Sequence, residues 1–104
     1  MLTTTTAEIP GKKISKVLGV VKGNTIRAKN IGRDIGAIFK SIIGGEIKSY
    51  TQMTTQAREE AFNRMVNEAI ALKADAIVNV RFATSMIMQG AAEMLAYGTA
   101  VKLK

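Results

Sequence analysis

The chain of 104 residues contains neither cysteine nor histidine. Without cysteine it has no disulfide, no thiolate nucleophile and no soft thiolate metal site. Without histidine it lacks the commonest metal ligand and the commonest general base, which excludes Ser-His-Asp triads and most zinc and copper sites. A Mg²⁺ or Ca²⁺ site would need clustered carboxylates. The eight acidic residues are instead scattered, apart from Glu59 and Glu60, whose side chains point in different directions on a helix.

Aromatic side chains are also scarce, with three phenylalanines, two tyrosines and no tryptophan. The core must therefore be built from Ile, Val, Ala and Met, which pack well only where small residues let the elements come close. The length and the 47% share of hydrophobic residues suit one globular domain over residues 1–104.

Acidic residues are rare in the first half of the chain, so the net charge of +7 is unevenly distributed. Residues 1–52 hold nine Lys or Arg against three acids, whereas residues 53–104 hold six against five. A basic half raises the possibility of binding to nucleic acid or to an anionic surface. No aromatic residue stands among these cations before Phe39, although single-strand binders use such stacking platforms. A solvated basic face is the preferred interpretation, and nucleic-acid binding is the alternative.

Long apolar runs are missing as well. The first thirteen residues, "MLTTTTAEIPGKK", lack the charged and apolar regions of a signal peptide. The apolar windows elsewhere are too short to span a bilayer, and Lys40 interrupts the best of them. We therefore expect a cytoplasmic protein without a membrane partner.

The first part of the chain favours strands and a short helix. Residues 1–8, rich in threonine, indicate a short strand closed by Pro10-Gly11. Residues 13–28 predict either one long strand with a bulge or a hairpin that turns at residues 22–24. Isoleucines spaced by three and four predict a short helix over residues 31–43, ended by Gly44-Gly45.

A second, longer helix is the clearest prediction. Its apolar face repeats every three to four residues and comprises Ala57, Ala61, Phe62, Met65, Val66, Ala69 and Ile70. A polar face lies opposite, with Glu60–Arg64 and Arg64–Glu68 as pairs of opposite charge four residues apart. One of three threonines, Thr51, Thr54 or Thr55, is expected to cap the start, and Lys73 to suit the negative end of the helix dipole.

Two strands follow, "AIVNVRFATSMI" and "EMLAYGTAVKLK", joined by the loop "MQGAA". Alternation in the first strand places Val78, Val80 and Phe82 on one face. The last strand is apolar on both faces, which is the pattern of a strand covered on both sides. The fold class is therefore α+β, a small and mainly antiparallel sheet packed by one long and one short helix. Because one long helix cannot cover both faces, either the short helix or a second subunit must cover the rest, and we expect a homo-oligomer.

Six residues are candidates for a ligand site or a subunit interface: Glu46, Tyr50, Arg58, Arg81, Glu93 and Tyr97. If residues 46–50 are extended, Glu46 and Tyr50 share one side and can meet Arg58. Arg58 would bind an anion, although a structural ion pair is the preferred interpretation. Arg81 would need a carboxylate such as Glu46 or Glu93 if it were buried.

No residue is assigned to catalysis or to a metal. Glu46 is the one candidate for a base, which makes an enzyme the least favoured class. Met86 and Met88 could suggest a thioether copper site, but adaptable core filling is the commoner use of methionine.

Several blocks resemble a known family. These are "ISKVLGVVKGNTIRAKNIGRDIGA", "GGEIKSYT", "AREEAFNRM" and "ADAIVNVRFATSMIMQGAAEMLAYGTAV", which are similar to the YbjQ-like family of small uncharacterised proteins, also described as a "putative heavy-metal-binding" domain. The resemblance runs from about Ile9 to Val101. It implies a compact α+β subunit that assembles into a ring-like homopentamer, and its name implies a metal, for which this chain offers no Cys or His ligand. Lys73 and Asn79 stand where relatives lead us to expect glycine.

The hypothesis from the sequence is thus a non-enzymatic cytoplasmic homo-oligomer, pentameric by resemblance. Its subunit clefts would hold a small anionic ligand or an oxygen-ligated ion. Binding of nucleic acid or of an anionic surface through the basic N-terminal half is the alternative function.

Overall fold

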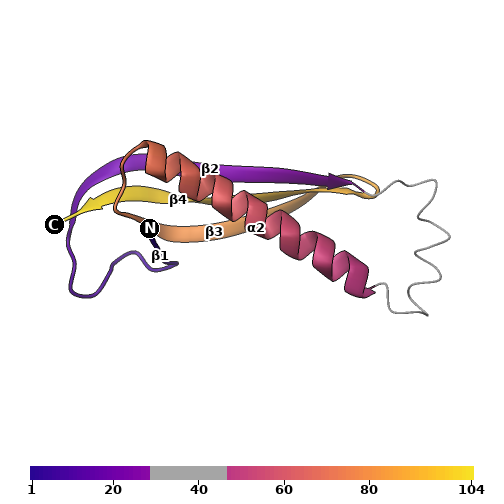
Figure 1. The fold of residues 1–104 in the computed structure, drawn as a ribbon, viewed down its shortest axis with the longest axis horizontal. Helices are drawn as coiled ribbons and strands as arrows, with labels where there is room; N and C mark the ends of the chain where they lie inside the picture. Colours follow the sequence, from indigo (N-terminus) through magenta and orange to yellow (C-terminus); the bar gives the residue numbers. More distant parts are fainter. Residues whose placement is uncertain (29–46) are drawn as a thin grey trace.

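The computed structural model describes residues 1–28 and 47–104. In this part of the chain, strands β1 (Leu2–Thr3), β2 (Ile14–Ala28), β3 (Ala76–Met88) and β4 (Ala91–Leu103) form one mixed sheet in the order β1-β3-β4-β2. Helix α2 (Ile47–Ala71) crosses one face of this sheet diagonally (Figure 1). The α+β prediction is confirmed, and the predicted short helix of residues 31–43 lies outside the described residues.

Strand β2 is a single long strand and not a hairpin. It pairs antiparallel with β4 along its whole length, from Ile14 opposite Leu103 to Ala28 opposite Ala91. Two register shifts, one of them just before Gly19, mark the irregularities of this ladder. The sequence "KGN" reads as a turn, but Gly23 has a different use: α2 packs against the strand where this residue has no side chain.

Strands β3 and β4 form a hairpin with a two-residue connection, Gln89-Gly90. Both strands are therefore longer, and the loop is shorter, than the sequence predicts. Gly90 has a positive φ of 81°, as short hairpin turns require in their central positions.

A bulge at Asn79 corrects the predicted faces of β3. Val78 lies opposite Thr99 and Arg81 opposite Tyr97, so three steps along β3 match two along β4. The extra residue shifts the alternation, because side chains change faces at every step of a regular strand. Val80 consequently joins the cluster under the helix, whereas Val78 belongs to a separate cluster. The prediction that they share a face was wrong.

Helix α2 begins at Ile47, which corrects the prediction of an extended link over residues 46–50. The three threonines expected to cap the helix all lie inside it, and Thr54 donates its hydroxyl to the carbonyl oxygen of Thr51 at 3.0 Å. The predicted apolar face is confirmed at every position except Ile70, whose side chain is 56% exposed.

The two predicted ion pairs along the helix are replaced by contacts to β2. Glu60 pairs with Arg27, and Arg64 donates from Nη1 to the carbonyl oxygen of Asn24 at 2.5 Å. Bonds between elements thus take the place of bonds along α2. They fix the position of the helix over the strand.

Helix α2 ends in a left-handed turn at Lys73. The amide of Lys73 donates to the carbonyl of Ile70 at 2.9 Å, and that of Ala74 donates to Ala69 at 3.1 Å. This is the Schellman pattern, which places a left-handed residue just past the helix. Lys73 (φ 61°) and Asn79 (φ 54°) are the non-glycine residues with positive φ in the described ranges. Both positions where glycine was expected therefore adopt the left-handed backbone conformation that glycine favours.

The core lies between α2 and the sheet. Met65 and Ile77 are its largest fully buried side chains, and the small residues Ala96 and Ala100 of β4 face the helix. The opposite, outer face of β4 is covered at one end, where Ile9 packs near Val101. Farther along, Tyr97 on the same face is 37% exposed. The apolar character of both β4 faces is confirmed, but within the described chain the second face is only partly covered.

The N-terminal segment follows the edge of β3. Strand β1 is parallel to β3, with Leu2 opposite Ala76. Beyond β1, the amide of Thr4 donates to the carbonyl of Ile77 at 3.0 Å. The threonine-rich segment is therefore fixed to the sheet mainly through backbone bonds.

Candidate functional site

A groove of about 560 Å³ lies beside helix α2, and we call it the threonine groove. Its volume falls in the range typical of small-molecule sites, about 300 to 1,000 Å³. It is lined by Thr3, Thr4 and Thr5 of the N-terminal segment, by Thr55, Arg58, Glu59 and Phe62 of α2, and by Val80 and Phe82 of β3. Three segments that are distant in the sequence therefore meet around it.

The apolar surface of the groove is formed by two phenylalanines. The rings of Phe62 and Phe82 have centroids 6.3 Å apart and are tilted by 39°, within the range of favourable aromatic pairs. Phe62 is half-buried, while Phe82 is 49% exposed. The bulge at Asn79 matters here, because it places Val80 and Phe82 on the helix side of the sheet.

The N-terminal wall of the groove is held by bonds to β3. The amide of Val80 donates to the carbonyl oxygen of Thr4 at 2.9 Å. Arg81 donates from Nη1 to the carbonyl oxygens of Thr5 at 2.8 Å and of Val80 at 2.9 Å. Arg81 thus links the backbone of the N-terminal segment to the backbone of β3.

Arg58 supplies the cation of the groove. Its Nη2 lies 3.5 Å from the hydroxyl oxygen of Thr55, a long contact. In residues 1–28 and 47–104, no carboxylate lies within ion-pair distance of Arg58. Glu59 lines the same groove and adds one negative charge. A guanidinium carries five N–H donors, so Arg58 keeps donors for an anion.

The predicted cluster of Glu46, Tyr50 and Arg58 is not built as expected. Glu46 lies outside the described residues. Tyr50 belongs to the first turn of α2 and not to an extended segment. Arg58 lies eight positions farther along the helix, which is about 12 Å along the axis.

Tyr97 and Glu93 lie on the outer face of the sheet, away from α2. Tyr97 stands between two cations, with Lys22 opposite it on β2 and Arg81 opposite it on β3. Glu93 accepts a hydrogen bond from Nδ2 of Asn24 at 3.2 Å. Arg81 is exposed, so it does not need the carboxylate that a buried arginine would require, and it contacts backbone carbonyls. The five candidates within the described residues therefore lie in different places: Arg58 lines the groove, Tyr50 is in the first turn of α2, and the others belong to β3 and β4.

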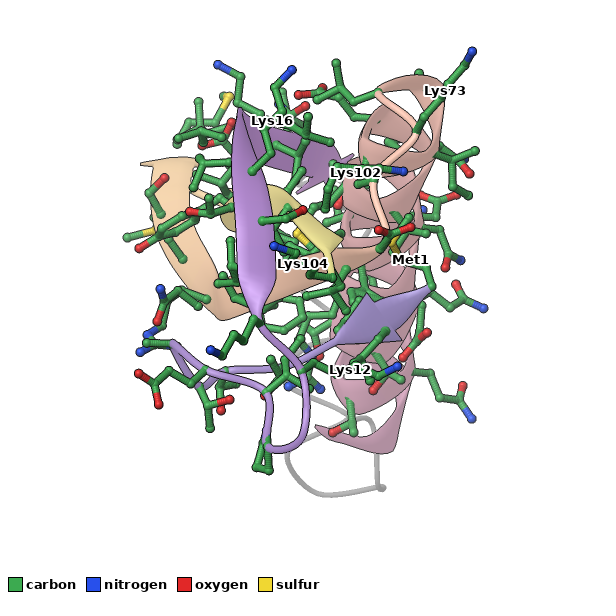
Figure 2. The ribbon with its side chains drawn as sticks, turned by 90° about the vertical axis from the view of Figure 1, so that its left-hand side faces the viewer. Met1, Lys12, Lys16, Lys73, Lys102 and Lys104 are labelled. Carbon is green, nitrogen blue, oxygen red and sulfur yellow. The ribbon has the colours of Figure 1, made fainter. Side chains whose placement is uncertain are left out.

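Lysines gather at the end of the molecule where β2 begins and where β4 and α2 end (Figure 2). Lys16 lies directly opposite Lys102, an unfavourable arrangement for like charges. Asp75 lies among them, and its Oδ2 accepts from the amide of Leu103 at 2.8 Å. This hydrogen bond, with the nearby charges of Lys102 and Lys12, lowers the pKa of Asp75 below its usual value of 3.8.

Comparison with known proteins now places the chain. A family model described as "Putative heavy-metal-binding" (YbjQ_1) matches residues 1–104. The chain belongs to the YbjQ_1 family. It is 64% identical to a UPF0145 protein of Methanoculleus marisnigri, over 99% of this chain and 96% of the relative. It is 61% identical to a UPF0145 protein of Photobacterium profundum, over 99% of this chain and the whole relative.

A solved structure confirms the fold of this YbjQ_1 protein. The fold of this chain is similar, with a TM-score of 0.70, to the crystal structure of a protein of unknown function from Pediococcus pentosaceus that belongs to the DUF74 family. The likeness covers 100% of this chain and 98% of the other, at 20% identity. At that identity the comparison speaks for the fold alone.

The metal in the YbjQ_1 description does not fit the residues of a single subunit. Heavy metals prefer thiolate and imidazole ligands, and the chain has neither. The described residues contain no group of three or more Asp or Glu that could hold an ion. Met86 and Met88 are 77% and 59% exposed, so the prediction that they fill the core was wrong.

The sequence pointed to Arg58 but not to the groove around it. The residues that line the groove with Arg58 include Phe62, which the sequence assigned to the core, and the threonines of the N-terminal segment. The threonine run was visible as a strand signal, but its position beside α2 depends on pairing with β3. No local pattern carries that information.

Within the described residues, the structure contains no helix that is both long and apolar enough to cross a membrane.

Proposed function

We propose that this YbjQ_1 protein is a non-enzymatic cytoplasmic homo-oligomer that binds a small ligand. The number of subunits, five, follows from the family resemblance. A binding role is favoured over catalysis because the chain has no histidine or cysteine and because no carboxylate cluster occurs in the described residues. One observation carries the assembly: an apolar stripe lies exposed on the outer face of the sheet.

This outer stripe consists of Val17, Val20 and Ile26 of β2, which are 61%, 69% and 57% exposed. Val20 lies opposite Thr99 of β4, and the next paired residue on that face of β4 is Tyr97. Lys22 and Asn24 lie between Val20 and Ile26 on this face. Isolated exposed apolar residues are normal, but several on one sheet face favour an interface. A second copy of the chain is the occupant that we propose, since the stripe continues the two-faced apolar pattern of β4.

The open edges of the sheet give a route to a closed ring. Strand β2 is at one end of the strand order. On its edge away from β4, strand β3 has no strand partner from Phe82 to Met88 among the described residues. Two unlike edges can pair head to tail, which generates a ring when the rotation closes. Phe82 also lines the threonine groove, so a subunit added at this edge would border the groove.

Native mass spectrometry tests the assembly at about 10 µM protein, and the concentration is fixed because the population of an oligomer depends on it. Five subunits of 11.2 kDa give about 56 kDa. Val20→Lys should shift the mass towards the monomer, because a charge would be buried in the interface.

Ile70→Lys is the matched control, since Ile70 is exposed on α2 and away from the outer stripe. It should leave the mass unchanged. A monomeric wild-type protein, or a Val20→Lys protein of unchanged mass, would refute the proposed assembly.

The alternative function, binding of nucleic acid, is favoured by one observation, the like-charged pair Lys16 and Lys102 at the basic end. It predicts binding to duplex DNA that weakens steeply between 50 and 200 mM salt, by about 10³-fold or more for six phosphate contacts. Fluorescence anisotropy with labelled duplex measures it. No binding at the lower salt concentration would eliminate this alternative.

A further inference from the structure

The threonine groove combines an aromatic surface with the guanidinium of Arg58, which has no carboxylate partner among the described residues. From this combination we propose that the groove binds an organic carboxylate with a compact aromatic or branched apolar body. The inference deepens the proposed function by naming the ligand class, and it rests on that function only for the claim that the protein binds ligands. The groove is built within one subunit, so binding and assembly can be measured separately.

The charge of the groove selects a monoanion. Arg58 is the one cation among the described residues that line it, and Glu59 lies on the same wall. A phosphate dianion would bring two charges to one guanidinium and would meet repulsion from Glu59. A carboxylate brings a single charge and matches the planar fork of the guanidinium with two parallel hydrogen bonds.

The body of the ligand follows from the opposite side of the groove. Phe62 and Phe82 present a tilted ring pair rather than a closed stack, and Val80 behind them is almost fully buried. A half-exposed phenylalanine on a groove wall gains by contact with another apolar group, because that contact removes apolar surface from water. A flat ring or a branched alkyl group placed against Phe82 would make this contact.

The threonines offer further hydrogen bonds to the ligand. The hydroxyl of Thr4 is engaged with Thr6 at 2.8 Å. The hydroxyls of Thr3 and Thr5 make no hydrogen bond to any residue that the structure describes. Both residues line the groove, so they can donate to the second carboxylate oxygen or to a polar substituent.

The probe for the test is 3-phenylpropionate, compared with the neutral 3-phenylpropan-1-ol of similar shape. Isothermal titration and amide chemical shifts measure the dissociation constants with the wild-type protein. Arg58→Gln should weaken binding of the acid about ten- to hundredfold, as expected for a lost charge-assisted hydrogen bond. The same change should alter the dissociation constant of the alcohol by no more than about twofold, because the neutral alcohol forms no charge-assisted bond with Arg58.

Arg64→Gln is the matched control. It removes an equal charge from the same helix, but Arg64 points to β2 and donates to Asn24. It should leave binding of the acid unchanged. Arg58 is exposed, so its replacement should not unfold the protein, and thermal unfolding of each variant verifies this.

Three results would overturn the inference: no binding of 3-phenylpropionate at 10 mM, above the about 1 mM dissociation constants of weak ligands, equal weakening by Arg64→Gln, or shifts confined to residues outside the groove. None of these depends on subunit number. If native mass shows an oligomer while the acid fails to bind, only the ligand class is lost. If the acid binds a monomer, only the assembly is lost.

Discussion

The packing of α2 on β2 makes Gly23→Ala the sharpest test of the fold. A Cβ at this position would lie 2.2 Å from the carbonyl oxygen of Ala61 and 2.4 Å from the amide nitrogen of Met65. Ordinary contacts of a Cβ begin at 3.4 Å, so the helix and strand would have to separate by about 1 Å. Both obstructing atoms belong to the helix backbone and cannot rotate away.

The energetic cost has two parts of opposite sign. Alanine restricts the unfolded chain and would stabilise the protein by about 0.4–1 kcal/mol if it fitted. Overpacking costs about 1–3 kcal/mol, and a gap of about 1 Å forfeits up to about half of the dispersion energy along the contact. We expect a net loss of about 1–2 kcal/mol in the free energy of unfolding, from a total of about 5–15 kcal/mol.

Urea unfolding followed by far-UV circular dichroism measures this loss. All proteins are compared at one protein concentration, because the proposed assembly would make stability depend on concentration. Gly98→Ala is the graded comparison: its nearest obstruction is the side-chain Cγ2 of Ile77 at 2.7 Å, and the nearest backbone atom is the carbonyl oxygen of Val78 at 3.1 Å. These clashes are milder than those at Gly23, so the loss should be smaller. The double variant Gly23→Ala with Ala61→Gly should not recover stability, since the clash is with the carbonyl oxygen. A Gly23→Ala protein as stable as wild type would refute the close packing described here.

Two further predictions concern the turn after α2. Lys73→Gly should raise the free energy of unfolding by about 1 kcal/mol, because a non-glycine residue is strained in the left-handed region; urea unfolding tests this, and a less stable variant would contradict it. Asp75 should stabilise the fold above its unfolded pKa and lose this contribution as the pH falls through the lowered folded value. The stability difference between wild type and Asp75→Asn should therefore shrink between pH 5 and about pH 3, and a difference constant over that range would argue against the hydrogen bond to Leu103.

The sequence predicted the elements well where one pattern decided the structure. The apolar face of α2 was correct from Ala57 to Ala69 because a buried row at helical spacing has one interpretation. The two-faced β4 was also correct, since Ala96 and Val101 both need cover. The start of α2 was missed because threonine favours caps, strands and turns more than helix interiors. Thr54 and the threonines beside it nevertheless belong to the helix, which begins at Ile47.

Other features depended on contacts between distant residues. A bulge adds one residue against a partner strand, so the exchange of faces between Val78 and Val80 could not be derived from β3 alone. Lys73 and Asn79 were noticed as departures from glycine, but their left-handed backbone became evident only in three dimensions. For the candidate site, Arg58 was found and its surroundings were not, because Thr3 and Phe82 meet it through the tertiary fold.

The strand order β1-β3-β4-β2 also sets a sequence of events for the nascent chain. Leu2 pairs with Ala76, and Ala28 pairs with Ala91, so neither β1 nor β2 has its partner until most of the polypeptide has been synthesised. Helix α2 and the β3–β4 hairpin involve near neighbours and can form first, whereas pairings over long separations slow folding. The growing chain consequently carries β2, with its apolar side chains, unpaired until β4 follows it out of the ribosome. The outer stripe, which is exposed in the folded chain, is therefore also exposed throughout this stage of synthesis, when chaperones can bind it.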